Sequence, residues 1–269
     1  MTRIILGMAA AVLFHWPAYA DSAYSSSLPV AEPVAASAPA HSARRAEFLG
    51  QSATPAVRQM ADWVANSRDN GALPFIIVDK RDAKVFVFDK NGQILGSAWA
   101  LVGLQRGDDS VPGIGTMPLH AITPEMRTTP AGRFVAGLGN DLGKLNVLWV
   151  DYATAISLHR VINTNPAERR LERIVSPVPA EHRISFGCIN VPAAFFDNVV
   201  EPAFKNTKGV VYILPEVKAM GAVFPGYREV AKPALLTADK TTGEAVSAIP
   251  AAYQQDRSVE DHDLAGIVH

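Results

Sequence analysis

The chain has 269 residues, of which 48% are hydrophobic and 19% charged, and its formal net charge is −1. These values are ordinary for a globular protein with a substantial core, and the length allows one large domain or two small ones. Because a nucleic-acid-binding surface needs a basic excess to neutralise phosphates, the balanced charge argues against a nucleic-acid partner.

Residues 1–20 are typical of a secretory signal peptide. Arg3 precedes an apolar run over residues 4–14, and the Ala-Tyr-Ala of residues 18–20 offers small side chains before a cut at Asp21. A membrane span needs roughly 20 apolar residues, so we expect removal of this segment rather than anchoring; the alternative is a short N-terminal helix. We therefore expect an exported protein of the periplasm or cell envelope, without a membrane span in its mature form.

Two short regions follow the signal peptide. Residues 21–54 are rich in Ala, Ser and Pro and have few large apolar side chains, so they predict a flexible arm. Residues 55–73 predict a short helix over 55–67, because Thr54 is a suitable N-cap and Pro55 suits a first turn. Apolar residues recur there at helical spacing, namely Val57, Met60 and Val64.

Residues 74–215 predict a single, mainly β domain with a few helices. Short apolar or alternating runs bounded by turn residues indicate strands, and they cover residues 75–78, 84–88, 94–102, 132–135, 147–150, 155–159 and 209–214. A turn at residues 89–92 predicts a hairpin. The loop over 103–129 is longer than a compact domain usually keeps without a function.

A helix and an uncertain tail complete the prediction. Residues 192–204 favour a helix, with Pro192 in its first turn and an apolar stripe behind it. Residues 216–269 have little periodicity, and we expect a tail that either wraps the domain or lacks order.

Cys188 is the sole cysteine, so no intramolecular disulfide can form. A lone thiol in an exported protein is either a small buried apolar group or a reactive one. Residues 185–190, Ser-Phe-Gly-Cys-Ile-Asn, form a glycine-containing turn just before the predicted helix, whose dipole would lower the pKa of the thiol. Gly187 leaves room for a substrate carbonyl, and backbone N–H groups around it are candidate donors to an oxyanion.

A cysteine nucleophile needs a base, and the predicted domain holds three histidines: His120, His159 and His182. His159 ends an alternating strand and shares its polar face with Ser157, so its imidazole can face a cleft. His182, six residues before Cys188, is the rival base. The strand-end position favours His159, and geometry decides between the two.

A strand ending in His159, followed by Ser185-x-Gly187-Cys188-x-Asn190 before a helix, resembles the L,D-transpeptidase (YkuD) family. The family's signature is a strand-end His followed by Ser/Thr-His-Gly-Cys-x-Arg/Asn. Residues 128–134, Thr-Thr-Pro-Ala-Gly-Arg-Phe, are similar to its Thr-Pro-x-Gly-x-Phe segment. The resemblance covers roughly residues 75–214. It implies a mainly β, sandwich-like fold with the Cys and His facing an active-site cleft.

The resemblance also implies a reaction. The thiolate attacks the amide between the L-centre and the D-centre of a peptidoglycan tetrapeptide stem, releases the terminal D-alanine and leaves a thioester. The acyl group passes to an amine of a neighbouring stem or of a cell-wall-attached protein, or to water. Cys188 takes the nucleophile's position and His159 the base's, while Ser185, Gly187 and Asn190 fall on the other motif positions. No cofactor and no metal are expected.

Two other functions stay open at this point. One is an L,D-carboxypeptidase that ends the same chemistry in hydrolysis, and the other is a weakly catalytic peptidoglycan-binding domain. Phe186, which stands where the family has its second His, and Arg160, where Gly or Ser is usual, are departures from the pattern.

The connection between the two motif residues is a further departure, because His159 and Cys188 are 29 positions apart. Residues 161–183 are rich in arginine, whose planar guanidinium group can bind a carboxylate through two parallel hydrogen bonds. We expect a lid beside Cys188, with Arg160 and Arg183 binding carboxylates of the donor stem. The alternative is a solvated helical turn with Arg–Glu pairs.

Overall fold

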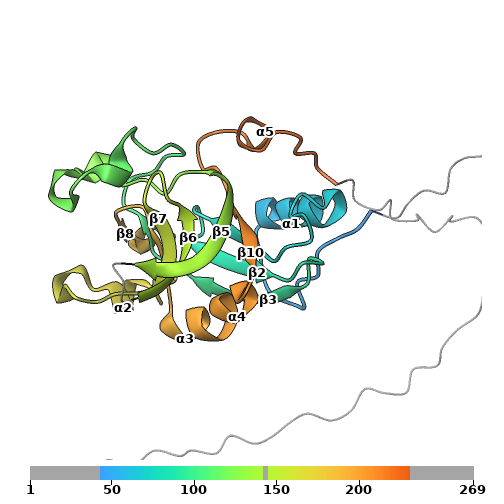
Figure 1. The fold of residues 1–269 in the computed structure, drawn as a ribbon, viewed down its shortest axis with the longest axis horizontal. Helices are drawn as coiled ribbons and strands as arrows, with labels where there is room; N and C mark the ends of the chain where they lie inside the picture. Colours follow the sequence, from blue (N-terminus) through green and yellow to red (C-terminus); the bar gives the residue numbers. More distant parts are fainter. Residues whose placement is uncertain (1–42, 142–144, 231–269) are drawn as a thin grey trace, which may run out of the picture. The chain divides into compact units, whose positions relative to one another are not determined.

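The computed structural model describes residues 43–141 and 145–230 (Figure 1). The predicted signal peptide, the arm up to residue 42 and the tail from residue 231 lie outside the described residues. The described part is mainly β with a few helices, so the predicted fold class is confirmed. Within it, no helix has both the length and the apolar character needed to cross a membrane.

Eight strands form one sheet, and two more form a separate parallel pair. The strands are β1 (Phe75–Asp79), β2 (Lys84–Phe88), β3 (Ile94–Trp99), β4 (Val102–Gly103), β5 (Gly132–Asp141), β6 (Leu145–Asp151), β7 (Ile156–Arg160), β8 (Arg183–Ser185), β9 (Ile189–Val191) and β10 (Lys208–Ile213). The sheet order is β3-β2-β1-β10-β5-β6-β7-β9, and β4 pairs with β8. The β1–β10 and β7–β9 pairs are parallel, and the other neighbours in the sheet are antiparallel.

The sheet curls until it nearly closes on itself. Leu101 follows β3, at one edge, and pairs with Asn190 of β9, at the other edge. The N–H of Leu101 donates to the Asn190 carbonyl at 2.8 Å, and the return bond is 2.9 Å. A sheet edge that finds such a partner is protected from pairing with other chains, and its residues are held in register. The eight-stranded sheet of the described part is therefore curved and nearly closed.

Each face of the sheet carries its own apolar cluster, as β1 illustrates. Ile76 and Val78 lie in one cluster, and Phe75 and Ile77 lie in the other. A strand buried on both faces has no polar alternation, which explains the continuous apolar run in the sequence. Burial of each such side chain contributes about 1.5–3 kcal/mol.

Helix α1 (Pro55–Ser67) covers the second of these clusters (Figure 1). The Thr54 side chain accepts the N–H of Val57 at 3.3 Å, so the predicted N-cap is confirmed. The helix ends where Arg68 takes a left-handed conformation with φ 58°. Its apolar stripe, predicted from spacing, is buried against the sheet.

The helix predicted over 192–204 is one continuous helical stretch with a π-helical turn in its middle. It consists of α3 (Ala193–Phe195), η6 (Phe196–Val200) and α4 (Glu201–Phe204). Phe196, Val200 and Phe204 are four positions apart, and all three are buried in the first cluster. The wider π turn keeps residues of this spacing on one side of the stretch.

The folded part extends beyond the predicted boundaries at residues 54 and 215. The N–H of Glu47 donates to the Gly92 carbonyl at 2.9 Å, and the Phe48 ring meets Phe88 edge-on at 5.4 Å. After the last strand, α5 (Met220–Val223) precedes buried Phe224 and Tyr227. Composition did not reveal these two segments, because only a few buried aromatic side chains hold each of them against the sheet.

A buried ion cluster holds the long loop after β4 in place. The loop contains three short turns: η1 (Ile114–Thr116), η2 (Leu119–Ala121) and η3 (Pro124–Met126). Lys80, 1% exposed in its side chain, donates to Asp108 at 2.8 Å and to the Thr129 carbonyl at 2.9 Å. Asp108 also accepts the backbone N–H groups of residues 216–218 at 2.6–2.8 Å. Both ends of the loop are thus tied to the end of β1.

A second long connection joins β7 to β8. It contains η4 (Pro166–Glu168), α2 (Arg170–Arg173) and η5 (Pro179–His182). In Figure 1 this segment and the loop after β4 extend from the same side of the sheet.

Candidate active site

Cys188 and His159 lie on neighbouring parallel strands. His159 pairs in register with Asn190, and Leu158 pairs with Ile189. Cys188 directly precedes β9, which places it beside β7, the strand that ends with His159 and Arg160. Two residues 29 positions apart in the sequence are thus brought together by strand pairing.

The expectation that Cys188 directly precedes a helix is wrong. Strand β9 and Pro192 stand between Cys188 and Ala193, where α3 begins. Because the field of a helix falls off within its first turn, the dipole of this helix does not lower the pKa of the Cys188 thiol.

The side chains on β7 supply the missing explanation. Burial raises the pKa of the Cys188 thiol, but the hydrogen bond and the charge of His159 outweigh burial and bring the pKa below its ordinary value. Ser157 adds to this, with its backbone N–H and with its hydroxyl, whose oxygen lies 3.7 Å from Sγ. Burial lowers the pKa of His159, yet the hydrogen bond and the charge of Cys188 raise it above its ordinary value. The two residues therefore favour a thiolate–imidazolium pair.

The orientation of the His159 ring follows from its second partner. Nδ1 lies 2.7 Å from the carbonyl oxygen of Arg160. A carbonyl only accepts, so Nδ1 carries a proton and donates it to this oxygen. Nε2 is then the nitrogen that exchanges a proton with the thiol.

Gly187 occupies a position that admits no side chain. Its φ is +131°, and a Cβ there would lie 2.8 Å from both the Ile156 Cδ1 atom and the Thr128 carbonyl oxygen. Thr129 donates its hydroxyl to the Gly187 carbonyl at 2.7 Å, and the Gly187 N–H donates to the Ser185 hydroxyl at 3.1 Å. The Gly187 N–H is therefore used within the chain, contrary to the expectation that it faces an oxyanion.

Ser185 and Asn190 hold the backbone of Cys188. The Ser185 hydroxyl donates to the Cys188 carbonyl at 2.6 Å, and the Asn190 amide nitrogen donates to the same oxygen at 3.3 Å. Both residues are buried. The amide oxygen of Asn190 accepts from Arg170 at 3.0 Å, so a third residue orients this amide.

Phe186, at the position of the family's second His, contacts an arginine. The guanidinium carbon of Arg127 lies 3.8 Å from the Phe186 ring centroid, the geometry of a cation–π contact. Arg127 follows η3, so the long loop after β4 reaches the turn that carries Cys188.

His182, the rival base, is fully buried away from the thiol. Its Nδ1 lies 3.0 Å from the Ala100 carbonyl oxygen and its Nε2 lies 2.9 Å from that of Ser176. Its ring also contacts Trp99 at 5.4 Å. These partners give His182 a structural role between β3 and the β7–β8 connection.

Arg160 and Arg183 are both engaged by carboxylates of the chain itself. Arg160 pairs with Asp197 at 2.7 Å and Glu201 at 3.0 Å, and its guanidinium lies over Phe196. Arg183 pairs with Glu216 and donates to the Lys80 carbonyl at 3.1 Å. The arginine of this region that reaches the motif residues is Arg170.

Three residues near the thiol were not singled out as site residues from the sequence: Thr129, Ser157 and Arg170, the last being one of five arginines in and beside the connection that were considered together. Ser157 was recognisable by its place on the His159 face of the strand, and Thr129 by its place in the 128–134 block. Arg170 carried no signal, since it is one of several arginines in a connection without periodicity.

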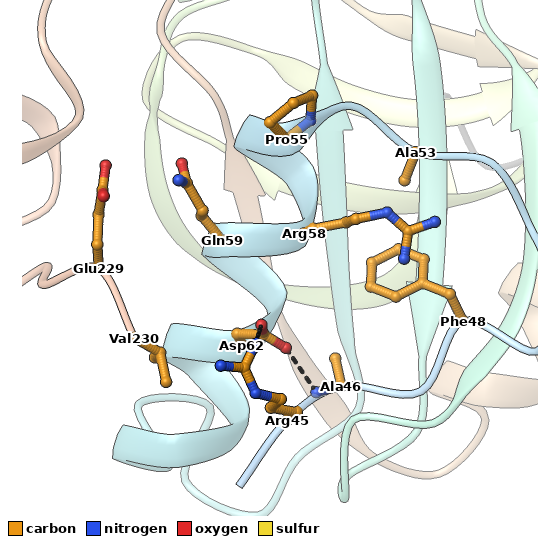
Figure 2. Close-up of a pocket in the computed structure, with 10 residues that line it drawn as sticks. All are labelled: Arg45, Ala46, Phe48, Ala53, Pro55, Arg58, Gln59, Asp62, Glu229 and Val230. Atoms are coloured by element: carbon orange, nitrogen blue, oxygen red, sulfur yellow. Dashed lines mark hydrogen bonds and ion pairs between the residues drawn. The ribbon is translucent and has the colours of Figure 1, made fainter. Parts of the chain in front are cut away.

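A cavity of about 970 Å³ lies elsewhere, between α1, residues 45–53 and residues 229–230 (Figure 2). The Arg58 guanidinium covers the Phe48 ring there at 4.5 Å, and Asp62 accepts the Ala46 N–H at 3.0 Å. The residues that line it do not include Cys188 or His159, so it does not belong to the candidate active site. Within the described chain, no group of three or more His, Cys, Asp or Glu side chains is placed to hold a metal ion.

No protein-family model and no curated protein matches this chain. Among solved structures, the chain is similar to the helical cell shape determining protein Pgp2 from Campylobacter jejuni, with 14% identity over 54% of this chain and 49% of that chain and a TM-score of 0.35. It is similar to an L,D-transpeptidase from Xylanimonas cellulosilytica, with 13% identity over 53% of this chain and 60% of that one and a TM-score of 0.32. It is also similar to the catalytic domain of the E. faecium L,D-transpeptidase, with 15% identity over 52% of this chain and 95% of that chain and a TM-score of 0.33.

The chain spans about half the length of the Pgp2 chain that it matches. With identities of 13–15%, these are distant likenesses, so the chemistry rests on the residues of this chain.

Proposed function

We propose that this protein is a cysteine-dependent L,D-transpeptidase that acts on peptidoglycan stem peptides. The observation that supports the proposal best is the Cys188–His159 pair, in which each partner shifts the pKa of the other toward the charged form. A cysteine that merely fills a core would gain nothing from a polar strand face with a serine and an oriented histidine. The resemblance of residues 185–190 and 128–134 to the family's motifs supplies the substrate class.

The chemistry proceeds in two balanced steps. The Cys188 thiolate attacks the carbonyl carbon at the L-centre, a C–S bond forms, and the C–N bond to the terminal D-amino acid breaks. The His159 imidazolium gives a proton to the leaving amine. An incoming amine then gives a proton to His159 and forms a new C–N bond, while the C–S bond breaks and the thiolate returns.

Electrostatic stabilisation of the tetrahedral oxyanion requires donors near Sγ. Since the Gly187 N–H is bound to Ser185, the N–H of Cys188 itself is the candidate donor. The exported location, the peptidoglycan partner and a cell-wall-attached protein as an acceptor belong to the same proposal.

The test is a product analysis by mass spectrometry. The protein is incubated with a purified disaccharide-tetrapeptide, and we expect a cross-linked dimer that has lost one terminal D-alanine. Cys188→Ala removes the nucleophile and should abolish this product. A disaccharide-tripeptide in place of the dimer would mean that water is the acceptor and that the protein is an L,D-carboxypeptidase.

A second measurement separates catalysis from binding alone. The resemblance implies that carbapenems acylate the cysteine, so intact mass should rise by one carbapenem in the wild type and stay unchanged in Cys188→Ala. A protein that binds the muropeptide but forms neither product nor adduct would be a peptidoglycan-binding domain, and the proposal would be wrong.

A further inference from the structure

The connection between β7 and β8 is fixed to the sheet on both sides of α2. At its start the Val161 N–H donates to the Val191 carbonyl at 2.8 Å, and at its end the His182 ring lies 3.0 Å from the carbonyl oxygen of Ala100, just after β3. Between them, Ile174 is buried. A side chain carried by α2 therefore has a fixed position relative to β9.

Arg170, the first residue of α2, points toward the candidate active site. Its Nη1 donates to the Asn190 amide oxygen at 3.0 Å, and that same amide donates to the Cys188 carbonyl. The charge of Arg170 opposes protonation of His159, so the guanidinium lies close enough to act on the catalytic pair. Its side chain is 13% exposed, and solvent therefore still reaches part of it.

The other arginines of this region have different surroundings. Arg160 and Arg183 pair with carboxylates on α4 and after β10, as described above. Arg173 donates to the carbonyls of Glu168 and Glu181, and Arg169 pairs with Glu172 at the surface. In the contacts of the described residues, Arg170 alone joins this segment to a motif residue.

Arg170 also keeps donors for a further partner. A guanidinium carries five N–H groups. Nε is paired with Glu168, and Nη1 donates to Asn190. Glu168 and Asn190 hold the plane of the guanidinium, so a carboxylate that binds to its remaining N–H groups loses little side-chain entropy there.

We propose that Arg170 binds the free carboxylate of the terminal D-amino acid of the acyl donor. This inference rests on the proposed function, because the terminal residue is the one that leaves when Cys188 attacks. In such a donor the carboxylate lies within a few bonds of the attacked carbonyl, and Arg170 lies one side chain away from Cys188. A charge-assisted bond here selects donors with a free C-terminal acid over donors that are blocked or extended.

The experiment compares two donors that differ only at this carboxylate. One is a tetrapeptide stem with a free C-terminal acid, and the other carries a C-terminal amide. The wild type should prefer the acid by about tenfold to a hundredfold in kcat/KM, the range of one charge-assisted hydrogen bond. Arg170→Gln should lose most of this preference, chiefly through KM for the acid, whereas any loss that acts through Asn190 or His159 lowers kcat/KM for both donors by the same factor and leaves their ratio unchanged. Arg169→Gln, on the same segment but at the surface, is the matched control and should keep the preference.

A structural role gives a different result. If Arg170 only orients Asn190, both donors lose the same factor in Arg170→Gln, and the proposal is overturned. The acid-to-amide ratio is internal to each enzyme sample, so partial unfolding of a variant cancels from it. Arg170→Lys keeps the charge without the fork and should retain part of the preference, and an unchanged ratio in both variants would also overturn the proposal.

Failure of the proposed function is recognisable separately. If the wild type turns over neither donor, the transpeptidase proposal fails and the role of Arg170 falls with it. If the wild type turns over both donors and the ratio persists in Arg170→Gln, the enzyme function stands and only the role of Arg170 is overturned.

Discussion

The lowered pKa of the Cys188 thiol comes from its neighbours on β7 and not from a helix. His159 and Ser157 sit on one face of that strand, and both bond to the sulfur. The sequence predicted the partnership with His159, because alternation along a strand assigns side chains to faces. It could not predict the origin of the low pKa, because β9 has only three residues and looks like the approach to the following helix.

The pKa directions predict the pH dependence of alkylation. A free cysteine becomes protonated below a pKa of about 8.5. Because the pKa of the Cys188 thiol is lower in the folded protein, its thiolate persists to lower pH. We expect the iodoacetamide rate of Cys188 to titrate with a midpoint below that of free cysteine. In His159→Ala only Ser157 still opposes the effect of burial, so the midpoint should move above that of the wild type. A wild-type midpoint equal to that of free cysteine would contradict the thiolate–imidazolium pair.

Gly187→Ala tests the close approach at the nucleophile turn. The new Cβ would lie 2.8 Å from the Thr128 carbonyl oxygen in a backbone conformation that disfavours side chains. We expect a loss of kcat/KM of at least about tenfold, because a small shift at a reacting atom is costly. Gly221→Ala, where nothing lies within 4 Å, is the control and should be neutral. Wild-type kinetics in Gly187→Ala would mean that the turn tolerates movement.

At the scale of elements, the apolar strands and the main helices followed from the sequence pattern, whereas the longest strand, β5, was predicted only over residues 132–135 and the three-residue strands β8 and β9 were not predicted. Strands β1, β2, β6 and β10 are apolar runs, and α1 has both a cap and a stripe. Strands β8 and β9 have three residues each, fewer than any periodicity can reveal, and partners distant in sequence hold them. Because the candidate site depends on these two strands, the sequence revealed the motif residues but not their arrangement in space.

His159 and His182 lie at the two ends of the β7–β8 connection, and we expect opposite effects when each is replaced by alanine. His159→Ala should lower kcat/KM by about 10²–10⁴ with little loss of stability, because it removes a general base. His182→Ala removes a buried ring that contacts two backbone carbonyl oxygens and opens a cavity, so it should lower the free energy of unfolding by roughly 2–4 kcal/mol. Its activity per folded molecule should stay near that of the wild type. Urea unfolding and kinetics on both variants check the pair, and the reverse result would make His182 the base.

At the scale of the whole molecule, one ion cluster joins segments from across the chain. Lys80 follows β1, Asp108 and Thr129 bound the long loop, and Glu216 follows β10. Composition gave no sign of it, because the residues meet only after the sheet has formed. Through Thr129, which bonds to the Gly187 carbonyl, the cluster also supports the nucleophile turn.

Asp108→Asn tests this cluster. The change leaves the charge of Lys80 buried with a weaker partner and should cost roughly 3–5 kcal/mol of unfolding free energy. Asp109→Asn, whose side chain is 71% exposed, should leave stability nearly unchanged. Thermal unfolding of both variants at neutral pH measures the difference. Equal stabilities of the two variants would mean that the ion cluster does not stabilise the fold.

The lowered pKa of the Asp108 carboxylate predicts that the stability of the fold decreases in acid. Burial would raise the pKa of Asp108, but Lys80 and the backbone N–H groups of residues 216–218 outweigh it and hold the pKa well below its usual range. Its contribution is therefore complete above the unfolded pKa of about 4 and is lost as the pH falls below it. The Tm of the wild type should drop over this acid range, and the drop should be smaller in Asp108→Asn. An identical acid dependence in both proteins would assign the sensitivity to other carboxylates.

The pairing of Leu101 with Asn190 has a consequence for the time at which the thiol becomes reactive. The two sheet edges meet late in the chain order, and Cys188 lies beside His159 only once β9 has docked. Before that, Cys188 is an ordinary thiol, mostly protonated at neutral pH and slow to react. Under the proposed function, folding itself therefore brings the thiol and its base together, and Cys188 becomes reactive only in the folded chain.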